Sequence, residues 1–229
     1  MSNLLYASVI ILATILIYLL ARKIYFKWKT PLLLPVTVTT VVIIVLLEIF
    51  QLSYETYMHG GKWIMELLGP AVVALAYPLY QHRKTLKQLY LPIIVGAFVG
   101  SIVGIVSGVG LAILANIDAV LISSLGPKSV TTPVAMELAK STGGVNFLAA
   151  VFVMIAGIGG TMLSATVFKY GKINHPVGRG LGIGSASHAI GTSKALENSK
   201  FEGSISTIAM ILSAFFVSIM LPPILLWWL

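Results

Sequence analysis

The chain has 229 residues, of which 58% are hydrophobic and 10% are charged, and its net charge at pH 7 is +8. Soluble domains usually carry about 25% charged residues and about 45–50% apolar ones. A soluble domain of this length cannot bury so much apolar surface, and the mean hydropathy of +0.98 points the same way. The composition therefore excludes an ordinary soluble domain and predicts a protein covered by lipid.

The positive charge also fits a membrane protein. Ten of the fifteen Lys and Arg residues fall into three short clusters between apolar segments, at 22–29, 83–87 and 169–179. Cytoplasmic loops of membrane proteins carry an excess of such residues. We therefore expect these clusters to face the cytoplasm, and we do not expect nucleic-acid binding.

The first apolar run, Leu4–Ala21, differs from a cleaved signal peptide. No basic residue precedes it, and Arg22 and Lys23 follow it directly, which is the opposite polarity. We expect a retained first span with the N-terminus outside. The chain has no cysteine, which excludes disulfides and thiolate chemistry.

Further apolar runs follow along the chain. A membrane-spanning helix needs about 20 apolar residues. Four more runs approach or exceed this length, and another is interrupted by Gly and Pro: Leu32–Ile49, Leu91–Leu114, Val145–Phe168 and Ile205–Leu229, with the interrupted run at Trp63–Tyr80.

Two segments of membrane length, Asp118–Ser141 and Leu181–Ser199, are unusually polar. If the first crossed the membrane, the basic cluster at 169–179 would lie outside, against the positive-inside rule. We therefore prefer a re-entrant element to a broken helix that crosses, and Leu181–Ser199 is expected to dip in from the cytoplasmic side. The predicted fold is an all-α polytopic membrane protein with about 7–8 membrane segments, including two broken or re-entrant helices. It forms a single membrane domain over 1–229, with scaffold spans at about 4–80 and a transport core at about 91–229.

Gly126 and Pro127 interrupt the first polar segment. Such a step frees backbone N–H groups at the start of a half-helix, where they bind anions; the alternative is a simple kink. Lys128 follows, and a buried ammonium in a membrane is costly unless it has a partner. We expect it to be the counter-charge of an anionic solute. The alternatives are an ion pair with Glu137 or Asp118, and a shallow position at the interface.

His188 lies in the second polar segment, near Ser185, Ser187 and Thr192. These side chains offer hydrogen bonds to the oxygens of a solute, and histidine changes charge near neutral pH, which suits proton coupling. The alternative for His188 is a structural hydrogen bond between helices. Glu137 is expected to be a buried carboxylate and a second candidate for proton coupling.

Gly96, Gly100, Gly104 and Gly108 recur at every fourth residue of one predicted span. Such a series leaves a groove along one helix face, which lets another helix approach closely. We predict helix packing at these glycines, within the chain or between subunits, with the glycines at 157, 159 and 160 as the partner face.

Motifs of catalysis are absent from the sequence. No pair of histidines has metal-ligand spacing, and no Gly-x-Ser-x-Gly elbow occurs. The stretch Gly180–Gly184 resembles a dinucleotide loop but has no strand before it. We expect no enzyme activity, no cofactor and no metal site.

Three stretches carry a resemblance to the LrgB/CidB family, with the CidB branch closer: Tyr57–Gly61 (YMHGG), Leu75–Tyr80 (LAYPLY) and Gly184–Glu197 (GSASHAIGTSKALE). The last is long and specific, and the likeness covers essentially the whole chain. The resemblance implies a holin-like or antiholin-like protein that controls murein hydrolases and lysis with a small CidA/LrgA-type membrane partner. It also implies transport of pyruvate in some bacterial members, and of glycolate and glycerate in a plant plastid relative.

Together these observations favour a secondary transporter of small monocarboxylates in the bacterial cell membrane, forming a homo-oligomer. The alternative is the lysis regulator acting with the CidA/LrgA-type partner. The expected substrate-binding residues lie in the two polar segments: Gly126, Pro127, Lys128, Ser129, Thr131, Thr132, Ser185, Ser187, His188 and Thr192.

Overall fold

The structure is a computed structural model that describes residues 2–28, 30, 33–67, 70, 73–74 and 76–228. These residues are overwhelmingly helical and contain no strand. They form two compact units, residues 1–74 and 75–229, which are described separately. The expected span 63–80 includes residues outside the described ranges. Whether the whole chain forms one membrane domain stays a prediction.

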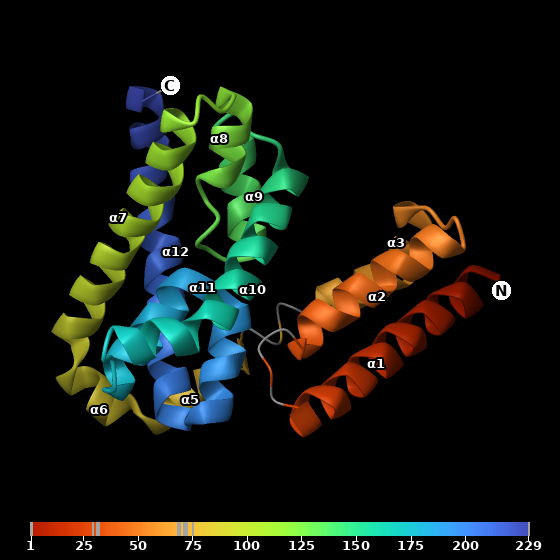
Figure 1. The fold of residues 1–229 in the computed structure, drawn as a ribbon, viewed down its shortest axis with the longest axis horizontal. Coiled ribbons are helices and arrows are strands. Elements are labelled where there is room, and N and C mark those ends of the chain that lie inside the picture. The colour runs from red at the N-terminus through yellow and green to blue at the C-terminus, as the bar shows by residue number, and fades with distance from the viewer. Residues whose placement is uncertain are drawn as a thin grey trace. The chain divides into compact units, whose positions relative to one another are not determined.

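The first unit contains α1 (Ser2–Trp28), α2 (Pro35–Ile49) and α3 (Tyr54–Glu66), with α1 packed against both others (Figure 1). Proline in the first turn of α2 lacks an N–H that would have no helical partner there. The hydroxyl of Ser53 accepts a hydrogen bond from the Thr56 amide and caps α3. Gly60 lets α3 approach α1, because a Cβ there would lie 2.7 Å from Ile10 Cβ.

The second unit begins with the short helices α5 (Ala76–Gln81) and α6 (Arg83–Gln88). Its long helices are α7 (Tyr90–Leu114), α10 (Asn146–Tyr170), α11 (Pro176–Asn198) and α12 (Lys200–Trp228). Between α7 and α10 lie α8 (Ala119–Leu125) and α9 (Thr132–Ser141). Helix α12 is central, since it contacts α5, α7, α9 and α11 and has buried residues along most of its length.

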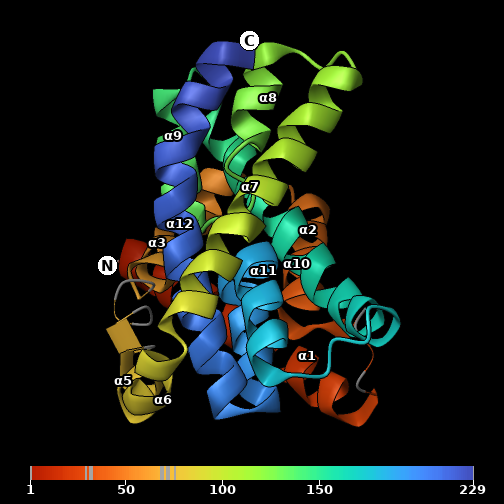
Figure 2. The same ribbon diagram turned by 90° about the vertical axis from the view of Figure 1, so that its left-hand side faces the viewer.

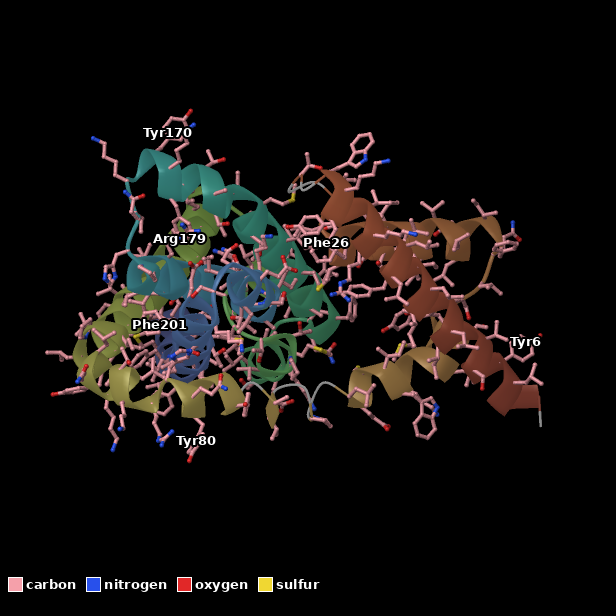
Figure 3. The ribbon with its side chains drawn as sticks, turned by 90° about the horizontal axis from the view of Figure 1, so that it is seen from below. Tyr6, Phe26, Tyr80, Tyr170, Arg179 and Phe201 are labelled. Atoms are coloured by element: carbon pink, nitrogen blue, oxygen red, sulfur yellow. The ribbon has the colours of Figure 1, made fainter. Side chains whose placement is uncertain are left out.

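Among the described residues, four helices are long and apolar enough to cross a membrane: Leu5–Trp28, Tyr90–Leu114, Asn146–Tyr170 and Lys200–Trp228. Each coincides with a run expected to span. Large apolar and aromatic side chains project from both units, including the exposed Tyr6, Tyr80 and Tyr170 (Figure 3). Helix α2 is apolar but has only 15 residues, and the number of crossings beyond four stays a prediction.

The segment 119–141 is broken into two helices, as expected. Helix α8 follows α7 closely, and residues 126–131 separate it from α9. At the end of α9, Ser141 and Thr142 line a cavity with Leu225 and Leu226 near the C-terminus of α12. Both ends of the segment therefore lie near the same end of α12, and the 126–131 break is its inner turn (Figure 2).

Helix α11 is also broken, at His188, whose φ of 38° and ψ of −130° are not helical. The two halves fold against each other, because a Cβ at Gly191 would lie 2.5 Å from Ile183 Cγ2. In a straight helix two residues eight positions apart are about 12 Å apart along the axis. Helix α11 is thus a hairpin beside the N-terminal part of α12, opposite to the hairpin of α8 and α9 (Figure 2).

Two apolar clusters hold this unit together at its two ends. One joins the later part of α7 and α12 to α8, α9 and α10, around Val109, Ile122 and Leu221. The other joins α6 and the early part of α7 to α11 and α12, around Ile93 and Ile205. Each broken helix is therefore anchored by its own cluster, and the two breaks point toward the middle of the unit.

Glycine permits the tight contact between α11 and α12. A Cβ at Gly184 would collide with the Ser206 carbonyl oxygen and lie 2.8 Å from Ala209 Cβ. We expect Gly184→Ala to lower the free energy of unfolding by about 1–3 kcal/mol, because packed helices must separate. Gly159→Ala is the control, since no atom lies within 4 Å of its Cβ position. Melting temperatures in detergent should fall for Gly184→Ala only.

Candidate functional site

A cavity of about 470 Å³ lies in the second unit, where the two broken helices approach α7. Its wall is formed by α7, by the 126–131 break, by the first half of α11 and by Ala156 of α10. The lining residues are Gly96, Gly100, Val103, Gly104, Ser107, Lys128, Ser129, Ala156, Leu181, Gly182, Ser185 and Ala186. Polar groups from both predicted segments thus share one cavity.

Three glycines of α7, Gly96, Gly100 and Gly104, line this cavity, and Gly108 continues the series; each of the four faces a different side chain. A Cβ at Gly104 would lie 3.1 Å from Ser129 Oγ, and one at Gly100 would lie 3.2 Å from Ser185 Oγ. Gly108 faces the Lys128 ammonium and Gly96 faces Leu181. We call this series the glycine ladder: Gly96, Gly100, Gly104 and Gly108. Because these glycines have no side chains, side chains of α11 and of the 126–131 break pack directly against α7.

Among the described residues that line this cavity, Lys128 alone carries a formal charge. Its Nζ donates a hydrogen bond to the Gly104 carbonyl oxygen at 3.3 Å. The ion pairs between described residues are Arg179–Glu202 and Lys194–Glu197, so neither includes Lys128. The Lys128 ammonium therefore makes one long hydrogen bond to a neutral group and no ion pair with a described residue.

The two carboxylates considered as partners of Lys128 lie elsewhere. Asp118 caps α8, where its Oδ1 accepts a hydrogen bond from the Val120 amide at 2.8 Å. Glu137 is exposed on α9 and lines a different cavity with Ser218. The expectation that Glu137 is buried was wrong, because its position on α9 faces away from the apolar cluster that covers Ala135 and Ala139.

Ser185 is the second polar group of the site. Its side chain is only 8% exposed, and its buried Oγ has no hydrogen-bond partner among the described residues. A buried hydroxyl left unpaired costs about 1–3 kcal/mol, so such a group usually has a partner. Ser129, also buried, lies on the same face of the cavity one step along the ladder. The two hydroxyls and the ammonium are hydrogen-bond donors that line the same cavity.

The other residues predicted in the first segment do not line the cavity. Gly126 is buried, and a Cβ there would lie 2.9 Å from Leu221 Cδ1. Pro127 is buried as well. Thr131 is the N-cap of α9 and Thr132 is its first residue.

The Gly126–Pro127 step does not begin a half-helix, contrary to the expectation. The chain makes successive turns instead, in which the Lys128 amide donates to the Leu125 carbonyl and the Val130 amide to the Pro127 carbonyl. These amides are used, and α9 begins six residues after Gly126. The break brings side chains, rather than the N-terminus of a helix at Gly126, to the cavity.

His188 also lies outside the cavity lining. Its ring is 2% exposed, and Nε2 lies 3.0 Å from the Val153 carbonyl oxygen of α10. This is the structural hydrogen bond that the sequence left open as the alternative. Thr192 is similarly occupied, with its Oγ1 2.8 Å from Ser206 Oγ of α12.

The glycines of α10 do not face the glycine ladder, as had been expected, but α11. A Cβ at Gly157 would lie 2.5 Å from the His188 ring, and Gly160 faces the hydroxyl of Ser187. Gly159 has open space beside it. Helix α11 thus lies between two glycine-bearing helices and is approached closely from both sides.

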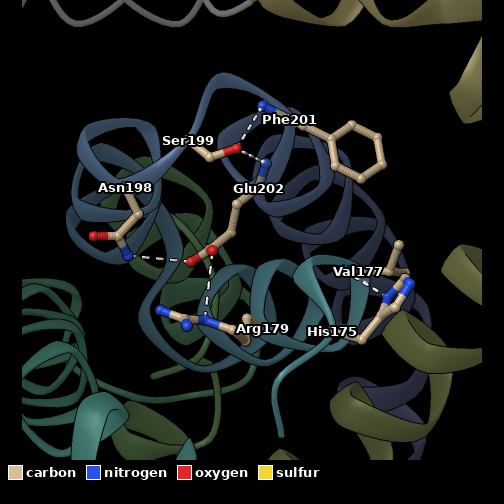
Figure 4. Close-up of polar contacts among 7 residues, drawn as sticks. All are labelled: His175, Val177, Arg179, Asn198, Ser199, Phe201 and Glu202. Atoms are coloured by element: carbon tan, nitrogen blue, oxygen red, sulfur yellow. Dashed lines mark hydrogen bonds and ion pairs between the residues drawn. The ribbon is translucent and has the colours of Figure 1, made fainter.

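A buried carboxylate, Glu202, was missed by the sequence analysis. It is 4% exposed, and its oxygens lie 3.4 Å from Arg179 Nε and 3.2 Å from Asn198 Nδ2 (Figure 4). Ser199 Oγ accepts a hydrogen bond from the Glu202 amide. The spacing Ser-x-x-Glu at the start of α12 is a capping-box signal that would have marked this position. Glu202 ties both ends of the α11 hairpin to α12.

Comparisons with known proteins agree with the sequence motifs. The model of the LrgB-like family matches residues 14–227. The Bacillus subtilis protein YxaC is 47% identical over 208 residues, which cover 91% of this chain and 90% of its own. The holin-like proteins CidB of Staphylococcus epidermidis and Staphylococcus aureus are 35% and 34% identical, and the matches cover 99% of each chain.

No solved structure matches the chain. The family assignment therefore rests on sequence, and the geometry above is read from this chain alone. A match over nearly the whole length, together with the apolar helices, identifies a membrane protein with holin-like relatives. The chain belongs to the LrgB-like family.

Proposed function

We propose that this protein is a secondary carrier of small monocarboxylates in the bacterial cell membrane. The observation that carries the proposal is the shared cavity, in which the Lys128 ammonium and the buried, unpaired hydroxyl of Ser185 lie along the glycine ladder. A carboxylate accepts charge-assisted hydrogen bonds from the ammonium and neutral ones from Ser185 and Ser129. Its charge offsets the cost of placing Lys128 at membrane depth.

The proposal includes a membrane arrangement. The α8–α9 hairpin dips in from outside and the α11 hairpin from the cytoplasm, with the N-terminus outside. Two observations support this arrangement. The two hairpins begin at opposite ends of α12. Basic residues, which favour the cytoplasmic side, lie at 83–87 and 169–172. Carriers commonly bind their substrate between discontinuous helices near the midplane.

Lys128→Met should weaken carboxylate binding by about 10- to 150-fold, because a hydrogen bond to a charged group contributes about 1.5–3 kcal/mol. The matched control is Lys140→Met, which removes an exposed lysine of α9. The measurement is saturable uptake of labelled pyruvate into liposomes containing the purified protein. Uptake of unchanged affinity in Lys128→Met would remove this lysine from the site.

Ser185→Ala should weaken the same binding by roughly two- to tenfold, the effect of one neutral hydrogen bond of about 0.5–1.5 kcal/mol. Ser193→Ala is its control, since that exposed hydroxyl only donates to the Ile190 carbonyl. Thermal stability should not fall in Ser185→Ala, because the hydroxyl has no protein partner to lose. A stability loss with unchanged binding would assign Ser185 a structural role instead.

Proton coupling through His188 is a further part of the proposal. The ring lies on the turn of the α11 hairpin, two positions from cavity-lining Ala186, and contacts α10. Glutamine keeps a donor for the Val153 carbonyl but cannot take up a proton. In His188→Gln, uptake should persist in counterflow while a pH gradient no longer drives accumulation. Normal accumulation in that variant would assign coupling to another group, such as Glu137.

A second candidate function is regulation of lysis with a small CidA/LrgA-type membrane partner. The printed name of the CidB relatives, holin-like protein, favours it over transport. The exposed apolar faces of α1 and α2 are suitable contact surfaces for a membrane helix of that partner, or for a second copy of the chain.

Lysis assays with the two lysine variants separate the candidates. If carboxylate flux underlies the effect on lysis, Lys128→Met loses that effect while Lys140→Met keeps it. If assembly alone matters, both variants keep it and still cross-link to the CidA/LrgA-type partner.

A further inference from the structure

The cavity has a polar end and an apolar end. Along the glycine ladder, Gly108 faces Lys128 and Gly104 faces Ser129, whereas Gly96 faces Leu181. The Lys128 ammonium bonds the Gly104 carbonyl oxygen, and eight residues of helix separate Gly96 from Gly104, which corresponds to about 12 Å at a rise of 1.5 Å per residue. The charge and the leucine therefore lie at opposite ends of an elongated site.

The apolar end of the cavity is lined by aliphatic side chains. Leu181 packs against the buried cluster of Leu86, Ile93, Val177 and Ile205, so it is held by its neighbours. Between the two ends, the walls include Val103, Ala156 and Ala186. Beyond Ser185, the described residues that line the cavity toward Leu181 carry no polar side chain.

The size of the cavity exceeds what a two- or three-carbon acid requires. Its volume of about 470 Å³ falls within the range of roughly 300–1,000 Å³ that holds drug-sized ligands. A small carboxylate at Lys128 would leave the Leu181 end unfilled. An apolar group that fills it gains from leaving water.

We infer that the site selects monocarboxylates with an apolar tail, bound with the carboxylate at Lys128 and the tail directed along the glycine ladder to Leu181. This inference rests on the proposed carrier function and specifies its substrate class. Leu181 is then the residue that sets the longest acceptable tail, because it occupies the end of the cavity remote from the charge.

The test uses the purified full-length protein in lipid nanodiscs. Displacement of labelled pyruvate is measured with acetate, butanoate, hexanoate and octanoate, and binding of the four acids is also measured directly by calorimetry. Affinity should rise by about fourfold for each added methylene group. The rise should stop where the tail reaches Leu181.

Leu181→Trp should shorten the tail at which the rise stops, read from the affinity of each acid relative to acetate in the same variant, because the indole fills the apolar end. Leu163→Trp is the control, since Leu163 of α10 is 61% exposed and does not line the cavity. Comparing variants at the same acid cancels any partition of that acid into lipid.

The outcomes separate this inference from the proposed function. If acetate and pyruvate bind but affinity stays flat or falls with tail length, the carrier function stands and the tail site is wrong. If affinity rises equally in Leu181→Trp and the wild type, the tail does not lie at Leu181. If no acid of any length binds, the carrier function itself is wrong.

Discussion

The structure of the second unit depends on how two helix breaks are enclosed by the neighbouring helices. Hydrocarbon offers no hydrogen-bond partners, so unpaired backbone groups survive there only inside protein or a wet cavity. The break at 126–131 satisfies two of its amides by tight turns and packs Gly126 on α12. The break at His188 is enclosed by α10 and α12, which bond its ring and Thr192. Each break is thereby enclosed by neighbouring helices, and buried polar side chains lie beside it.

Glycine makes both enclosures possible, and for the same reason. A side chain on α7 at positions 100 or 104 would occupy the space that Ser185 and Ser129 take, and one at Gly157 would displace the His188 ring. The two halves of a broken helix occupy more width than one straight helix. The neighbouring helices therefore need small residues where they face it. The left-handed φ at His188, a conformation that side chains other than Gly rarely adopt, is held by the ring contact with Val153.

The sequence predicted the long helices and both breaks, and it singled out Lys128, Ser129 and Ser185, which line one cavity, because hydropathy and local polarity carry that information. It failed where the answer depends on which side of a helix faces which neighbour. His188 and Ser185 lie within one turn of each other, yet only Ser185 lines the cavity, since the hairpin turn sends the ring to α10. Glu137 was expected to be buried from its place in a polar segment, but the face it occupies follows from the packing of Ala135 and Ala139. Glu202 was missed because burial through a partner such as Arg179 is a tertiary property.

The different qualities of the contacts around α11 have a mechanical consequence. The backbone of α11 packs directly on that of α12, because a Cβ added at Gly180 would lie 2.7 Å from the Glu202 carbonyl oxygen. The Glu202 carboxylate also contacts both ends of the α11 hairpin. Toward α7, glycine meets the tips of flexible side chains, which rotate at little cost. Helix α11 is therefore fixed to α12 by backbone contacts and by Glu202, whereas only side-chain contacts separate it from α7; α12 also packs against α7 through both apolar clusters.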